Sequence, residues 1–201
     1  SGFQIAMSDL EIRGGGTVLG ASQSGHIAAV GYDMFLQLME NAMAELKGDP
    51  LPKALEPEIH LDLPAYFPET YIQDIDQRLS AYRRLTKVTE LSEISDFKGE
   101  LIDRFGALPR EAVNLLSKVL LRVLSIKAGV KRLDLVGHQL ILNFSEAHIK
   151  DPTGIIEMIG SNPKKFGFTS DQVLEVKLTK QIKASQLAQT KNILKEIVER
   201  V

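Results

Sequence analysis

The sequence predicts an α+β fold in which helices pack on a small mixed or antiparallel sheet. A stretch that alternates polar and apolar residues at 58–63 precedes three consecutive helical patterns. Two short apolar stretches then flank a glycine-containing turn, and a helix, a strand and a last helix follow. Because strands and helices do not alternate one by one, a regular βαβ winding is not expected.

In front of this domain, residues 1–48 show a helix–loop–helix pattern. Residues 1–10 predict a short helix, and residues 12–25 predict a loop with five glycines. Residues 32–47 predict a helix, because their apolar residues recur every three or four positions. Gly48 and the prolines at 50 and 52 end that helix and predict a linker over 49–52. We therefore expect two units, residues 1–48 and residues 53–201.

The second unit begins with the strand at 58–63, which Pro64 ends. Helices are predicted at 72–88, 91–105 and 109–128, each with apolar residues on one face. The apolar stretches at 133–136 and 140–144 predict a hairpin around Gly137. A helix at 152–161, a strand at 173–178 and a helix at 184–201 complete the predicted domain.

Composition excludes several classes of site. The chain has 24 basic and 26 acidic residues, and this balance argues against a stand-alone nucleic-acid-binding domain, which usually has a basic excess. With no cysteine, disulfides and thiolate metal sites are excluded, and the four histidines lack the spacing of a zinc site. The short basic pairs are predicted to be solvated surface: Arg83-Arg84, Lys131-Arg132 and Lys164-Lys165.

Membrane insertion and secretion are not expected either. Three basic residues interrupt the apolar stretch at 112–130, which therefore predicts a buried helix and not a membrane span. No charged segment followed by an apolar one opens the chain, so no secretion signal is predicted. We expect a cytoplasmic protein. The chain opens on Ser1 without a methionine, and we expect it to be a piece of a longer protein.

A glycine-rich loop carries the sharpest motif. Gly14, Gly16 and Gly20 allow close backbone approach, Arg13 offers a cationic fork, and Gln23 offers a donor and an acceptor. No lysine follows the glycines as in a phosphate-binding loop, and no strand leads into them as in a dinucleotide site. On spacing alone, a surface loop that needs glycines to turn is the simpler interpretation.

The full string resembles a translocation motif that two families of DNA-dependent motors share, the RecG helicases and the transcription-repair coupling factors. The matching residues are Gly2-Phe3-x-Ile5-Ala6-x-x-Asp9-Leu10-x-Ile12-Arg13-Gly14-x-Gly16-x-x-x-Gly20-x-x-Gln23-Ser24-Gly25. The resemblance implies that residues 1–48 are the end of the second RecA-like motor domain. It implies that Arg13 and Gln23 couple ATP hydrolysis to movement along double-stranded DNA.

Later residues resemble the transcription-repair coupling factors and not RecG, which lacks the domain concerned. The matching stretches are Gly31-Tyr32-x-x-Phe35-x-x-Leu38-x-Glu40-Asn41-Ala42, Arg78-Leu79-x-x-Tyr82-Arg83-Arg84 and Glu100-Leu101-Ile102-Asp103-Arg104-Phe105-Gly106-x-Leu108-Pro109. In that family the C-terminal domain is regulatory. It packs on an N-terminal module that resembles UvrB and hides the surface for UvrA. The resemblance places this contact on Glu100 and Asp103, one helical turn apart.

The resemblance implies a non-catalytic piece of an ATP-dependent translocase that displaces stalled RNA polymerase and recruits excision repair. No cofactor is expected in this piece, whereas the parent would use ATP and Mg²⁺. Three alternatives stay open: a stand-alone protein-interaction scaffold, a RecG-like helicase fragment and a direct nucleic-acid-binding domain.

Overall fold

The computed structural model describes residues 55–145, 153–169, 173–179 and 183–200. Within these ranges the chain forms five helices and one five-stranded sheet, which confirms the predicted α+β class. The predicted boundary at 49–52 and the whole unit 1–48 lie outside the described residues. In chain order the elements are β1 (Glu58–Leu61), α4 (Ile75–Thr86), α5 (Leu91–Phe105), α6 (Arg110–Lys127), β2 (Val130–Val136), β3 (Gln139–Phe144), α7 (Thr153–Ser161), β4 (Phe166–Phe168), β5 (Val173–Lys177) and α8 (Lys183–Val198).

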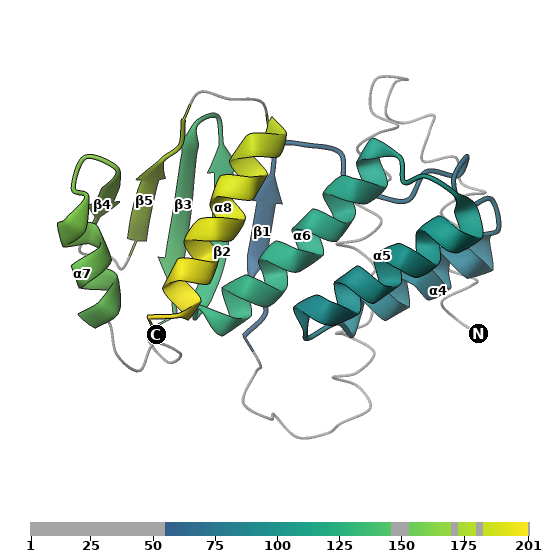
Figure 1. Cartoon of the computed structure of the whole chain (residues 1–201), viewed down its shortest axis with the longest axis horizontal. Helices are drawn as coiled ribbons and strands as arrows, with labels where there is room; N and C mark the ends of the chain where they lie inside the picture. The colour runs from purple at the N-terminus through teal and green to yellow at the C-terminus, as the bar shows by residue number, and fades with distance from the viewer. Residues whose placement is uncertain (1–54, 146–152, 170–172, 180–182, 201) are drawn as a thin grey trace, which may run out of the picture.

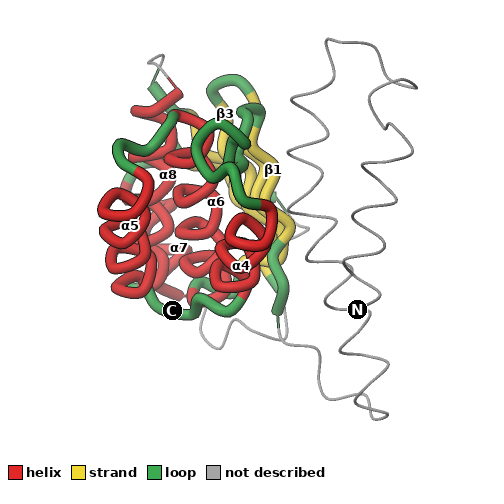
Figure 2. The backbone as a smooth tube through the Cα atoms, turned by 90° about the vertical axis from the view of Figure 1, so that its right-hand side faces the viewer, coloured by secondary structure: helices red, strands yellow, loops and turns green. Residues whose placement is uncertain are grey.

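The sheet is mixed, with strand order β1-β2-β3-β5-β4. β1 pairs parallel to β2, and the other neighbours pair antiparallel. Helices α6, α7 and α8 lie on one face of the sheet, while α4 and α5 continue the helical layer past the β1 edge (Figure 1). Figure 2 shows the same arrangement edge-on, with the helices to one side of the strands. Strand β4 was not predicted, because three residues with a central glycine give no measurable alternation.

Two apolar cores divide the domain, and α6 contributes to both. The first core lies between the sheet and α6, α7 and α8, and includes Leu121 and Leu124. The second lies among α4, α5 and α6, and includes Leu115, Val119 and Val123. An 18-residue helix that is apolar on two sides can serve two cores at once. Because α6 is apolar on both sides, its sequence is a long and largely apolar stretch, which is also typical of membrane spans.

Local capping sets where the helices begin. Helix α4 begins at Ile75, three residues later than predicted, because the Asp74 carboxylate accepts a hydrogen bond from the backbone N–H of Gln77 at 2.8 Å. Helix α5 begins with a reciprocal cap, in which the Glu93 carboxylate accepts from the backbone N–H of Glu90 at 2.8 Å.

The predicted hairpin is confirmed, and its turn is one residue shorter than the predicted strands 133–136 and 140–144 imply. Val136 pairs with Gln139, which leaves a two-residue turn of Gly137 and His138. Gly137 has φ = 58°, a conformation that side chains with a Cβ rarely adopt. Behind the turn, the buried Gln186 of α8 donates to the carbonyl of Gly137 at 2.9 Å, so the hairpin is held against the last helix.

A buried arginine on α6 connects this helix to the end of α4. Arg122 of α6 is 5% exposed, and its Nη2 donates to the carbonyls of Leu85, Thr86 and Val88 at 3.3, 3.3 and 2.8 Å. These carbonyls lie at and just after the end of α4, where the last carbonyls of a helix have no N–H donor within the helix. Arg122 therefore fixes the end of α4 against the middle of α6.

Candidate docking site

The candidate site is the outward face of α5. Ile94, Phe97 and Leu101 of this helix are buried in the second core, at the spacing of one helix face. Glu100 and Asp103 lie on the same helix outside that buried face, so both carboxylates reach the surface. Both carboxylates lie on one helix, one turn apart, and their role in docking remains a prediction from sequence.

Glu100 is held between two arginines from two helices. Arg84 of α4 contacts Oε2 of Glu100 through Nη1, and Arg104 of α5 contacts Oε1 through its own Nη1 at 3.1 Å. Arg104 also donates through Nη2 to the Gln77 side-chain oxygen at 3.1 Å. Hydrogen bonds from Arg84, then from Arg104, lower the pKa of the Glu100 carboxyl below its ordinary value.

Each of the two arginine guanidiniums packs on an aromatic ring. The Arg84 guanidinium lies over the Phe97 ring, 4.7 Å from its centroid, and that of Arg104 lies over the Phe105 ring at 5.0 Å. A cation over an aromatic face is attracted by the ring quadrupole, so each guanidinium has a preferred position. Both arginines stay half exposed, at 49% and 52%.

The Asp103 carboxylate differs from that of Glu100 in its contacts. Its side chain is exposed, and among the described residues no ion pair or hydrogen bond reaches its carboxylate. Among the described residues, Asp96, one turn before Glu100 on the same exposed side of α5, has no ion pair or hydrogen bond either, so Glu100 is flanked by two uncommitted carboxylates. Ile102 beside Asp103 is 41% exposed, and a Cβ added at Gly99 would meet no atom within 4 Å. Near Asp103 the helix thus offers a free carboxylate and, at Gly99 one turn earlier, an open backbone position.

The translocation-motif residues cannot be placed in this site. Arg13, Gly14, Gly16, Gly20 and Gln23 lie outside the described residues. Their predicted role remains a prediction from sequence.

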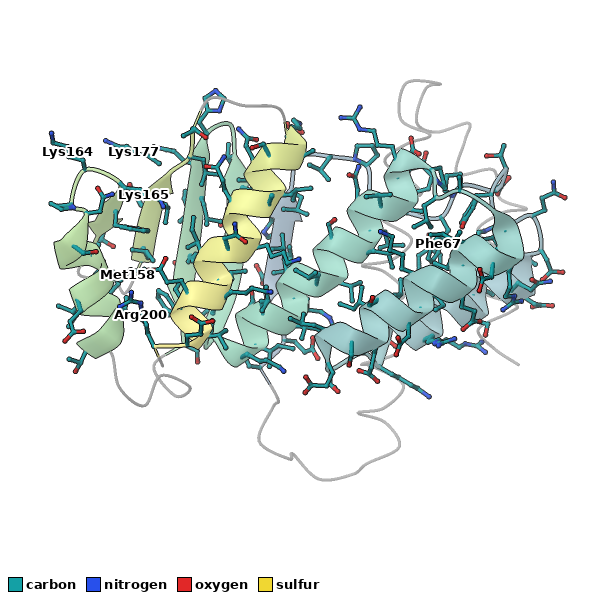
Figure 3. All side chains as sticks on the ribbon, in the orientation of Figure 1. Phe67, Met158, Lys164, Lys165, Lys177 and Arg200 are labelled. Carbon is teal, nitrogen blue, oxygen red and sulfur yellow. The ribbon has the colours of Figure 1, made fainter. Side chains whose placement is uncertain are left out.

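Two hollows lie elsewhere in the described part of the chain. A groove of about 630 Å³ lies between α6 and α8, and its lining contains no histidine. A smaller hollow of about 190 Å³ is lined by Lys164, Lys165 and Lys177 near β4 and β5 (Figure 3). Across the described ranges, no group of three or more histidine, aspartate or glutamate side chains is placed to hold a metal. No described helix is long and apolar enough to cross a membrane.

Comparison with known proteins assigns the family. Residues 61–155, which include α4, α5, α6 and the hairpin, match the family model described as the TRCF domain. The chain belongs to the TRCF-domain family. It is 32% identical to the transcription-repair-coupling factor of Myxococcus xanthus over 198 residues, 98% of this chain and 16% of that protein. It is 34% identical to that of Escherichia coli K12, over 83% of this chain and 15% of that protein.

The TRCF relatives are much longer than this chain, which spans about one sixth of their length or less. The Bacillus subtilis factor is 44% identical over 61% of this chain and 10% of its own length. Among solved structures, the C-terminal domain of a transcription-repair coupling factor superposes with a TM-score of 0.63, at 20% identity, covering 72% of this chain and 92% of that domain. At that identity the superposition establishes the shared fold.

Sequence reasoning missed the partners of Glu100. Arg83 and Arg84 are exposed, as predicted, but the ion pair of Arg84 with Glu100 joins two helices, which sequence spacing does not reveal. The second partner was open to prediction, because Glu100 and Arg104 are four residues apart on one helix.

Proposed function

We propose that residues 53–201 form the regulatory docking domain of a transcription-repair coupling factor. The observation that carries the proposal is the α5 face, where an uncommitted Asp103 carboxylate lies beside the arginine-bound Glu100. A basic surface of an N-terminal, UvrB-like module of the parent is the expected partner, because exposed carboxylates select and orient cationic groups. Docking there would hide the surface of that module that binds UvrA.

Charge reversal in the full-length parent tests this function. Glu100→Lys with Asp103→Lys should repel the basic module and expose it, so that immobilised UvrA captures the parent. Glu157→Lys is a matched control, because Glu157 is an exposed carboxylate on α7, on a different helix from the proposed face. Equal UvrA capture by the unmodified parent and the double variant would refute the docking role.

We further propose that residues 1–48 transmit the step of the parent motor. The alignment over 198 residues with the Myxococcus xanthus factor supports this extension, since it includes the glycine-rich segment as well as the folded domain. The parent would hydrolyse ATP with Mg²⁺, move on double-stranded DNA and displace RNA polymerase. In the parent, Arg13→Ala should leave ATP hydrolysis intact and abolish polymerase displacement. Joint loss of both activities would contradict a coupling role.

A further inference from the structure

Both oxygens of the Glu100 carboxylate are already engaged within the domain. Arg84 contacts Oε2 and Arg104 contacts Oε1, so each oxygen is bound by a guanidinium from a different helix. A carboxylate can accept further bonds, but its strongest, charge-assisted positions are occupied here. A cationic group from a partner would have to share Glu100 with both arginines or displace one of them.

The half-exposed arginines also place two positive charges beside the docking face. Like charges oppose the approach of a basic partner, and this opposition is screened by salt because the groups are near the surface. Asp103 has no such competitor among the described residues, so its carboxylate is open to a cationic group of a partner.

We propose that Arg84 and Arg104 act as a built-in brake on docking, by competing with the basic partner for the carboxylate of Glu100. This inference rests on the proposed docking function and adds its regulation. The rival role is orientation, in which the arginines hold Glu100 in its docking geometry. The two roles predict opposite signs: removing an arginine strengthens docking if it competes and weakens docking if it orients.

Conservative variants separate these roles. Arg84→Gln and Arg104→Gln keep a long polar stem while removing the charge, and each leaves the other arginine on Glu100. Lys98→Gln is the matched control, because it removes one positive charge from the exposed surface of α5 without a contact to Glu100. The measurement is a titration of the 201-residue chain against the purified UvrB-like N-terminal module of the same parent protein.

Each arginine variant should bind the module about two- to fivefold more tightly, the range implied by measured exposed ion pairs. The double variant should gain more than either, and the gain should shrink as salt is raised from about 50 to 500 mM because of screening. The Lys98 control should gain less than either arginine variant. Unchanged or weaker binding by both arginine variants would overturn the brake, as would an equal gain by the Lys98 control.

An Asp103→Asn arm separates failure of the brake from failure of the docking function. Loss of binding on Asp103→Asn, with no gain from the arginine variants, would uphold docking and refute the brake. If the unmodified chain does not bind the module at all, both the docking function and the brake are refuted.

Discussion

Gly154 at the start of α7 lies directly against the backbone of Arg200, two residues past the end of α8. A Cβ built at Gly154 would be 2.5 Å from the Arg200 carbonyl oxygen and 2.8 Å from its Cβ. Contacts below 3 Å to backbone cannot be relieved by a side-chain rotation, so one helix end has to move. The absence of a side chain at residue 154 therefore sets how closely the start of α7 approaches the turn after α8, where Arg200 lies (labelled in Figure 3).

Gly154→Ala should lower the free energy of unfolding by about 1–3 kcal/mol, the usual range for overpacking. Gly160→Ala on the same helix is the control, because its added Cβ meets no atom within 4 Å. It should be neutral or stabilising by up to about 1 kcal/mol through helix propensity. Urea unfolding followed by circular dichroism measures both. Equal effects of the two substitutions would show that the contact with Arg200 does not constrain α7.

Arg122→Met should destabilise the domain by about 2–4 kcal/mol. The substitution keeps an apolar stem but removes the guanidinium that donates to the carbonyls of Leu85, Thr86 and Val88, of which Leu85 keeps a backbone donor. Arg110→Met is the comparison, because Arg110 is exposed at the start of the same helix. It should change the unfolding free energy by less than about 0.5 kcal/mol. A loss below that level for Arg122→Met would mean that water replaces the guanidinium at these carbonyls.

Acid should destabilise the start of α5 through Glu93. Backbone N–H groups of Thr89 and then Glu90 donate to its carboxylate and lower its pKa from the model-compound value of 4.5. A lowered folded-state pKa gives stability that is present above the unfolded value and is lost as pH falls through the folded value. Glu93→Gln should therefore reduce the pH dependence of the unfolding free energy below about pH 4.5. Parallel pH profiles for the two proteins would exclude this contribution.

The purified chain should not turn over ATP. Its sequence lacks the G-x-x-x-x-G-K-[ST] phosphate loop of ATP-driven motors, and we expect the nucleotide site to lie elsewhere in the parent. A phosphate-release assay with Mg²⁺ and double-stranded DNA measures this directly. ATP turnover that co-purifies with the chain and survives a second chromatographic step would contradict the prediction.

Local signals in the sequence were sufficient for most of the fold. Periodicity located all five described helices and four of the five strands, because long amphipathic stretches bury one face wherever they lie. The parallel pairing of β1 with β2 was not predictable in this way, since it joins Ile59 to Leu133 across three intervening helices. The same limit applied to the site: Glu100 and Asp103 could be located on one helix, but their different ion pairing depends on Arg84 from another helix.

The position of helix α6 between two cores affects how the domain unfolds. Because it contributes to both apolar cores, melting either core alone leaves α6 packed against the other. Its amides should therefore be among the slowest in the domain to exchange with deuterium, and the free energy of their exchange should approach that of global unfolding. Exchange of the α6 amides would then report the loss of both cores together, whereas the amides of α5 and of the sheet could exchange when a single core melts.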